Sequence, residues 1–495
     1  MFDALFTTTT EYKKLSHALS GKGACALFGL PASGRAQVYA ALCRQLDKPL
    51  CIVTPGEAEA TRFAADLNTL GIPAAVFPAR DYVLRPIEGT AREYEYRRLA
   101  VLGELVGGRL RAVAVPAEAL TQFTTPKEDF CANTRTLHAG DTLLRDDLLA
   151  ALFGAGYTRR AQVDGPGQFS VRGDIVDIFA PDQKMPVRME FWGDEIDTLH
   201  TFDLTTQRRE DAIDKFYLSP AREVLFGKPA DAAEQLRAFL AKQRGKKKTA
   251  MADCMAADLD LLDGGAVPVN MDKYLAVRYP HPATVLDYFD DPILVAEEPA
   301  SIREADRATA YRRGEELKSL ILDGVLCAGL DNLYADPSYL WSKTGYYRTI
   351  CAENFARSMP DQPLKDIVNA PAHTLPAWNG EVAGLLEDLK PLCDAGYTVT
   401  LLAGTDRAAA GLARDLRDKG ILVTTDAAAA PATVRRMTLS PEQDPEPLYC
   451  VRRYGKGKRK MISSQETCWT ETDIWRFDES SPRWEGADTE TFLLC

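Results

Sequence analysis

The sequence predicts an α/β protein built on a parallel sheet, with a small α+β domain inserted into it. Three observations support this class. Short apolar runs alternate with helix-like segments up to about residue 123, two glycine-punctuated segments of alternating polarity follow, and mixed helix and strand patterns then return. Apolar runs separated by amphipathic helices are typical of a parallel sheet, whereas strict alternation is typical of antiparallel strands.

The amino-terminal part contains the strand-like runs ACALFGL, CIVTP, AAVFPA and RAVAVPA. Helix-like segments, such as GRAQVYAALCRQL after the first run and EAEATRFAADLNTLG after the second, separate them. In parallel sheets of this kind, ligands bind at loops that follow the carboxyl ends of strands. The loop GLPASGRA, residues 29–36, therefore lies where a nucleotide phosphate would bind.

This loop has the glycine spacing of a phosphate-binding loop but not its chemistry. Gly29 and Gly34 fit the pattern G-x-x-x-x-G-K-[ST], while Arg35 and Ala36 replace the lysine and the hydroxyl residue. Guanidinium is larger and planar, so it does not substitute for a compact ammonium, and alanine cannot ligate Mg²⁺. The pattern predicts a vestigial nucleotide loop (a degenerate P-loop), with weak anion binding at the helix amino terminus left open.

The best-placed acidic box is altered as well. In LVAEEP, Glu297 and Glu298 follow an alanine at the position where an aspartate would bind Mg²⁺. We therefore expect a vestigial acidic box and no ATP hydrolysis by this chain. Glycines can persist in the loop because a tight strand-to-helix turn needs them whatever the ligand.

The inserted part is expected to expose an arginine and tryptophan face. In the strand VRMEFW, alternation places Arg188 and Trp192 on the face opposite the apolar residues, and Gly193-Asp194 is expected to form a tight hairpin turn. Arg172 precedes Gly173 in the preceding strand, where a bulge or a close backbone approach is expected. From the residues alone, two interpretations remain equally good: a protein-binding face, or a structural role in which Trp192 caps the edge of the core and the arginines are solvated.

Composition narrows the class of protein. The 495 residues carry a net charge of -12, which argues against wholesale nucleic-acid binding. The two dense basic runs, RGKKK (residues 244–248) and GKGKRK (residues 455–460), are interpreted as solvated loops. Eleven scattered cysteines without a C-x-x-C pair indicate reduced thiols and no metal site. Without a signal peptide or membrane-length apolar run, the chain is expected to be cytoplasmic and free of membrane contacts.

The two segments GPGQFSVRGDIVDIFAP and PVRMEFWGDEIDTLHTFD resemble the second domain of the transcription-repair coupling factors (Mfd), which that family shares with the excision-repair protein UvrB. The resemblance extends over roughly residues 20–425 and includes AGYTVTLLAGTDRAAAGLARDL. It implies that Arg172, Arg188 and Trp192 bind the damage sensor UvrA. It also implies that ATP, Mg²⁺, RNA polymerase and DNA belong to motor and polymerase-binding domains, whose motifs we do not find in this sequence.

The resemblance and the composition shifts together predict the domain organisation. We expect a UvrB-like domain 1a with the degenerate P-loop (1–124), an inserted UvrA-binding-like domain 2 (125–209), a domain 1b (210–365), a linker (366–380), a partial small α/β domain (381–432) and an aperiodic tail of unassigned fold (433–495).

The favoured function is a non-catalytic module that recruits UvrA and so couples stalled transcription to nucleotide excision repair, either as a fragment or as a truncated gene product. In the complete family, by resemblance, an ATP-dependent DNA translocase displaces the stalled RNA polymerase. The alternative is an active UvrB-type ATPase or helicase, which the altered loop disfavours. A stand-alone nucleic-acid-binding protein is disfavoured by the acidic balance.

Overall fold

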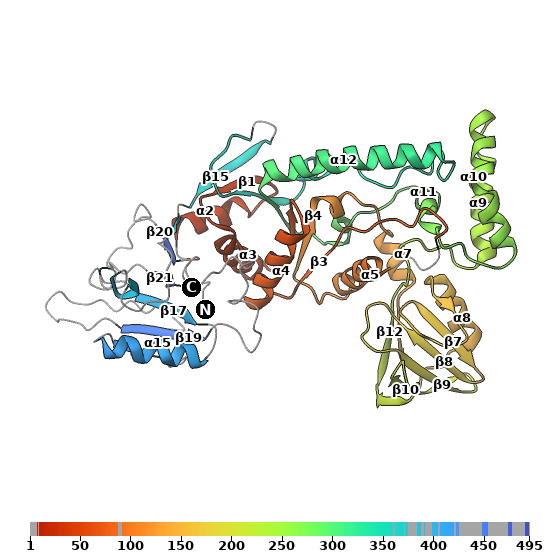
Figure 1. The fold of residues 1–495 in the computed structure, drawn as a ribbon, viewed down its shortest axis with the longest axis horizontal. Helices are drawn as coiled ribbons and strands as arrows, with labels where there is room; N and C mark the ends of the chain where they lie inside the picture. The colour runs from red at the N-terminus through yellow and green to blue at the C-terminus, as the bar shows by residue number, and fades with distance from the viewer. Residues whose placement is uncertain are drawn as a thin grey trace.

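The computed structural model describes residues 7, 9–87, 92–359, 362–370, 372–374, 384–387, 391, 398–403, 406–419, 422–424, 448–453, 474–477 and 491–494. At its centre is a seven-stranded sheet in the order β15-β1-β14-β13-β2-β4-β3 (Figure 1). All its pairings are parallel, as the alternating pattern predicted. The strands are β1 (Gly23–Phe28), β2 (Leu50–Thr54), β3 (Ala74–Val76), β4 (Ala112–Pro116), β13 (Ile293–Glu297), β14 (Arg348–Glu353) and β15 (Leu364–Asn369).

Helices cover both faces of this sheet because its strands are apolar on both sides. Along β1, Cys25 and Leu27 belong to one buried cluster with Tyr39 and Phe63. The alternate β1 residues belong to a second cluster, which includes Leu99. The helices of the first face are α2 (Thr10–Ala18), α3 (Ala32–Leu46) and α4 (Glu57–Thr69), and those of the second include α5 (Glu93–Val106), α6 (Ala117–Leu120) and α12 (Pro299–Leu322).

A domain with a mainly antiparallel sheet is inserted between β4 and β13, which confirms the predicted fold class (Figure 1). Its six-stranded sheet has the order β11-β10-β9-β8-β7-β6, and β5 pairs with β12 beside it. These elements run through Leu218, beyond residue 209, where we placed the boundary. They are β5 (Arg135–His138), β6 (Thr158–Arg159), β7 (Gln168–Arg172), β8 (Ile175–Phe179), β9 (Val187–Trp192), β10 (Glu195–Phe202), β11 (Arg209–Ala212) and β12 (Lys215–Leu218).

The inserted sheet has one face packed and the other largely open. Helix α8 (Arg145–Gly154) places Leu148 and Leu152 in a buried cluster with Val176, Met189 and other residues of the strands. The opposite face carries only a small cluster around Phe202. This asymmetry leaves the strand ends near Trp192 available to solvent.

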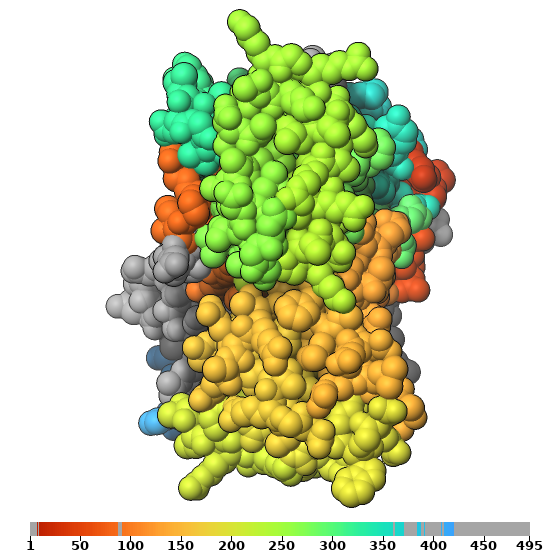
Figure 2. Space-filling model, turned by 90° about the vertical axis from the view of Figure 1, so that its right-hand side faces the viewer, coloured from red at the N-terminus to blue at the C-terminus, as the bar shows by residue number. Residues whose placement is uncertain are grey.

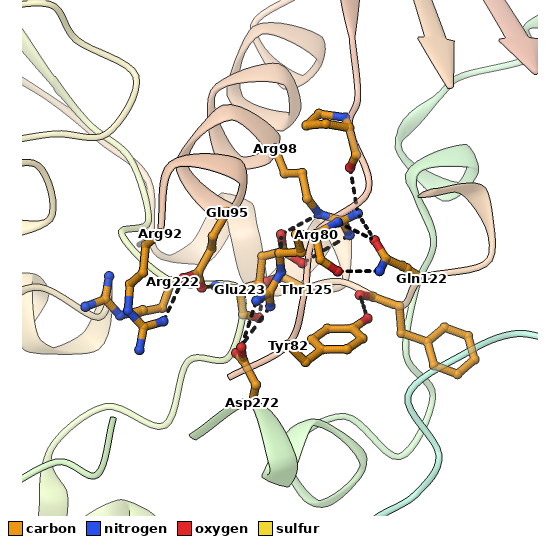
Figure 3. Close-up of polar contacts among 12 residues, drawn as sticks. Arg80, Tyr82, Arg92, Glu95, Arg98, Gln122, Thr125, Arg222, Glu223 and Asp272 are labelled. Carbon is orange, nitrogen blue, oxygen red and sulfur yellow. Dashed lines mark hydrogen bonds and ion pairs between the residues drawn. The ribbon is translucent and has the colours of Figure 1, made fainter. Parts of the chain in front are cut away.

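A buried ionic network fixes the inserted domain to the parallel-sheet domain (Figure 3). The Arg98 Nε atom lies 2.6 Å from Glu223 Oε1, and Arg80 Nη1 lies 2.7 Å from Asp272 Oδ2. The Thr125 hydroxyl donates a hydrogen bond to the Glu223 carbonyl oxygen, so the two chain segments that lead into and out of the insert are joined. Charges buried this deeply require partners, so the junction should hold one geometry.

The chain between the insert and β13 is mainly helical. Its apolar residues form a third cluster around Leu236, Met251 and Tyr274. Figure 2 shows one side of the molecule. The lime-green segment that contains α9 and α10 lies at one end of this side, and the gold and yellow inserted domain lies at the other end. Outside the carboxyl-terminal part, the remaining helices of the described residues are α7 (Lys127–Ala132), α9 (Pro229–Ala241), α10 (Gly245–Asp263), η1 (Met271–Tyr274), α11 (Leu275–Arg278), η2 (Val285–Tyr288) and α13 (Tyr339–Lys343).

A second six-stranded sheet, in the order β16-β20-β21-β17-β19-β18, lies in the carboxyl-terminal part. Three of its strands come from the tail to which we assigned no fold. These strands are short and their pairing partners are distant in sequence, so local patterns did not predict them. The elements are β16 (Ala372–Thr374), β17 (Thr398–Ala403), α15 (Asp406–Asp418), β18 (Leu422–Thr424), β19 (Leu448–Arg453), β20 (Ile474–Phe477) and β21 (Thr491–Leu494).

Candidate protein-interaction face and the altered nucleotide loop

The vestigial nucleotide loop is a short strand-to-helix turn. Gly29 follows β1 with φ 91°, a backbone conformation that favours glycine, and α3 begins at Ala32. The amides of Gly34 and Arg35 both donate to the Pro31 carbonyl oxygen, at 3.0 Å. A phosphate-binding loop leaves such amides free to cradle the ligand. Here the first turn of the helix uses them, and Ala36 is completely buried.

The side chain of Arg35 reaches the vestigial acidic box. Its Nη2 atom lies 2.8 Å from Glu297 Oε2 and 2.9 Å from Glu298 Oε1, and its Nη1 atom donates to the Leu30 carbonyl oxygen at 3.1 Å. The Tyr39 hydroxyl donates to the other oxygen of Glu297. Burial raises the pKa of the Glu297 carboxyl, and the charge of Arg35 partly offsets this rise. The two altered halves of the predicted site therefore bind each other.

The interaction face predicted on the insert begins at the hairpin between β9 and β10. Trp192 pairs with Glu195 across the two-residue turn Gly193-Asp194, and Gly193 has φ 64°. This confirms the predicted turn. Burial alternates along β9 as the sequence indicated, and Trp192 at its end is 82% exposed. A side chain with that exposure is available for contact with a partner.

Arg188 lies on the same face but is less open than the alternation suggested. Its Nε and Nη2 atoms donate to the two carboxylate oxygens of Asp177, at 2.7 and 2.9 Å. Its guanidinium lies over the Phe202 ring, 4.7 Å from the centroid, and only 13% of its side chain is exposed. Hydrogen bonding to Asp177 raises the pKa of Arg188. Arg188 thus holds β9 against β8 beneath the exposed residues.

Arg172 is the more accessible arginine of the face. Its side chain is 51% exposed, and its Nη2 atom lies 3.4 Å from Asp177 Oδ2. Gly173 next to it forms a second tight turn with φ 61°, and a Cβ atom there would meet nothing within 4 Å. The expected bulge or close backbone approach is therefore wrong: Gly173 supplies the positive φ of a hairpin. The Phe191 amide donates to the Asp174 carbonyl oxygen at 2.9 Å, which places this turn beside Trp192.

Two contributors to this face were not predicted. Asp177 is 1% exposed and lies under both arginines. Alternation along GDIVDIF places Asp177 on the same face of the strand as Ile175, and this signal could have predicted its position. Leu144 is 53% exposed, and the preceding amide, that of Leu143, donates to the Asp194 carbonyl oxygen at 2.7 Å. Leu144, at the start of α8, is therefore an exposed apolar residue next to the segment that contacts the turn after Trp192.

The sequence also led to expectations about cysteines, metal ligands, membrane helices and basic runs. The cysteines that the structure describes, among them Cys25 and Cys51, are free thiols. No group of metal-ligating side chains occurs among the described residues. Within those residues, no helix combines the length and the apolar character needed to span a bilayer. The basic run at residues 244–248 opens α10, whereas the run at 455–460 lies outside the described residues.

Comparison with known proteins identifies the inserted domain. Residues 136–224 match the model of the UvrB interaction domain, a range that contains Arg172, Arg188 and Trp192. A transcription-repair-coupling factor of Bacillus subtilis is 24% identical over 408 residues, which are 80% of this chain and 34% of that protein. This chain is a relative of the transcription-repair coupling factors.

Further coupling factors agree with this relationship over shorter stretches. The Myxococcus xanthus coupling factor is 35% identical over 208 residues, covering 40% of this chain and 17% of the relative. The Mycobacterium bovis coupling factor is 34% identical over 257 residues, covering 50% and 20%. The chain thus spans about a third or less of the length of these coupling factors. The resemblance stated from the sequence is confirmed.

Proposed function

We propose that this chain recruits UvrA through the outer face of its inserted sheet and so couples stalled transcription to nucleotide excision repair. The observation that carries the proposal is Trp192, an 82% exposed indole at a hairpin turn within the matched UvrB interaction domain. Exposed tryptophan and arginine side chains dominate binding energy at protein interfaces because each buries a large area and arginine also pairs with carboxylates.

The geometry divides the face into a support and a contact surface. Arg188, Asp177 and Phe202 form the support, because their contacts are made within the domain. Trp192 and Arg172 form the contact surface, because they retain most or half of their exposure. A preorganised support lowers the ordering cost of binding, so the rigid turn should increase affinity.

The test measures UvrA binding by the Trp192→Ala variant with isothermal titration. A hot-spot tryptophan contributes about 2 kcal/mol or more, so the variant should bind at least roughly 30-fold more weakly. Tyr311→Ala is a matched control, since Tyr311 is 75% exposed on α12, outside the matched domain. Normal binding by Trp192→Ala, with the control also normal, would remove the assignment.

We also infer that the parallel-sheet domain does not bind or hydrolyse Mg-ATP, in contrast to the alternative of a UvrB-type ATPase. Arg35 is already neutralised by Glu297 and Glu298, and the amides of Gly34 and Arg35 are hydrogen-bonded to the Pro31 carbonyl oxygen. By the resemblance, ATP and Mg²⁺ belong to the motor domains of the family and RNA polymerase to its polymerase-binding domain.

Calorimetric titration of the chain with Mg-ATP provides the test. We expect no heat of binding at micromolar to low millimolar nucleotide, because binding would require breaking a buried ion pair. A micromolar dissociation constant that is lost on Arg35→Ala would show instead that the loop still binds nucleotide.

A further inference from the structure

A cationic surface lies at the tip of the helical hairpin formed by α9 and α10. The residues from Lys242 to Lys248 contain five cations and no carboxylate. They include the connection between the antiparallel helices and the first turn of α10, and all five are exposed. The cations of this cationic tip are Lys242, Arg244, Lys246, Lys247 and Lys248.

Charge is segregated along the hairpin. The carboxylates of α9 lie in its first half, and those of α10 begin at Asp253. Arg237, nearer the base, is paired with Asp263 across the two helices. In contrast, no cation of the tip makes an ion pair within the part of the chain that the structure describes. Lys247 lies beside the loop at Gly329, and the other four residues belong to the connection and the first turn of α10.

This arrangement is unfavourable for the isolated hairpin. The first turn of α10 contains three lysines and no acidic residue, although the positive end of a helix dipole favours acidic residues there. Arg244 at the N-cap and Lys248 are also four residues apart, a spacing at which like charges repel one another. The lysines at the start of α10 are therefore unfavourably placed, and no carboxylate of the described residues pairs with them. This indicates a partner that supplies negative charge.

We propose that the cationic tip binds the phosphate backbone of duplex DNA. The tip has charge but no aromatic side chain for stacking on bases, which excludes the usual chemistry of single-strand binding. It also lacks the large apolar anchor that protein interfaces require. Because the chain as a whole is acidic, at -12, this attraction is local and sets the orientation of the DNA on the molecule.

The inference is independent of UvrA recruitment and departs from our expectation that DNA is contacted only through motor domains. It also revises our interpretation of the 244–248 run as a solvated loop. Figure 2 shows the hairpin segment at the opposite end of the face from the inserted domain. DNA at the tip and a protein at Trp192 could therefore be bound together.

The experiment measures binding of the full chain to a fluorescent 30-base-pair duplex as a function of salt. Each neutralised phosphate contributes about 0.9 to the slope of log affinity against log salt. The variant Lys246→Gln/Lys247→Gln/Lys248→Gln should therefore have a slope shallower by up to about 2.7, and at least roughly tenfold weaker binding at low salt.

A matched control removes the same charge elsewhere. Arg159→Gln/Arg160→Gln/Arg208→Gln changes three exposed arginines of the inserted domain and should leave the slope unchanged. An unchanged slope in the lysine variant, or an equal change in the control, would overturn the proposal. So would a wild-type chain that binds polyglutamate but shows no salt-dependent binding to the duplex, since the tip would then serve an acidic protein.

Discussion

Two arginine–carboxylate sites show how burial changes what the same pair of groups does. Arg35 and Glu297 join α3 to β13 with side chains 4% and 2% exposed, and they close the vestigial nucleotide loop. Arg188 and Asp177 join β9 to β8, but Arg188 is 13% exposed and lies below an open aromatic residue. The first pair seals a site, whereas the second supports a surface.

The difference arises from what surrounds each pair. Arg35 lies in the first turn of α3, beside the end of β13, where its side chain and Glu297 are buried and each charge must be matched inside the protein. Arg188 lies on the thinly covered face of a sheet whose core is on the other side. An arginine on such a face keeps one strand in place without occupying the surface that a partner would contact.

The largest expected effect follows from breaking the sealed pair. Arg35→Ala leaves the fully buried Glu297 carboxylate without its cation, so the opening free energy of the β13 amides should fall by about 3 to 5 kcal/mol. Native-state hydrogen exchange measures this locally, which avoids treating a multidomain chain as one cooperative unit.

The exposed pair of Arg85 and Asp323, whose side chains are 44% and 49% exposed, provides the control for that measurement. Arg85→Ala should change the opening free energy by at most about 1 kcal/mol, since exposed ion pairs contribute little. If Arg35→Ala were as mild as this control, Arg35 would not be the residue that closes the loop.

The sequence could predict the elements that carry both sites but not the contacts between them. Alternation along VRMEFW and the glycine at position 193 are local, and both were confirmed. The contact of Arg35 with Glu297 depends on strand order across residues far apart in the chain, to which local patterns are blind. Asp177 was missed because its pairing with Arg188 depends on the register of β8 against β9. The face of a strand is therefore more predictable than its cross-strand partner.

The smaller expected effects separate the two arginines of the inserted sheet. Arg188→Ala removes two short charged hydrogen bonds to a buried carboxylate, so the opening free energy of the β8 and β9 amides should fall by about 1.5 to 3 kcal/mol.

Arg172→Ala removes a single contact of 3.4 Å from a half-exposed side chain and should lower the same opening free energy by about 0.5 kcal/mol or less. Hydrogen exchange of both variants, beside UvrA titration, tests the division into support and contact surface. Arg172→Ala should weaken UvrA binding without loosening the sheet. If it loosened the sheet as much as Arg188→Ala, both arginines would belong to the support, and Trp192 would be the contact residue that remains of the predicted three.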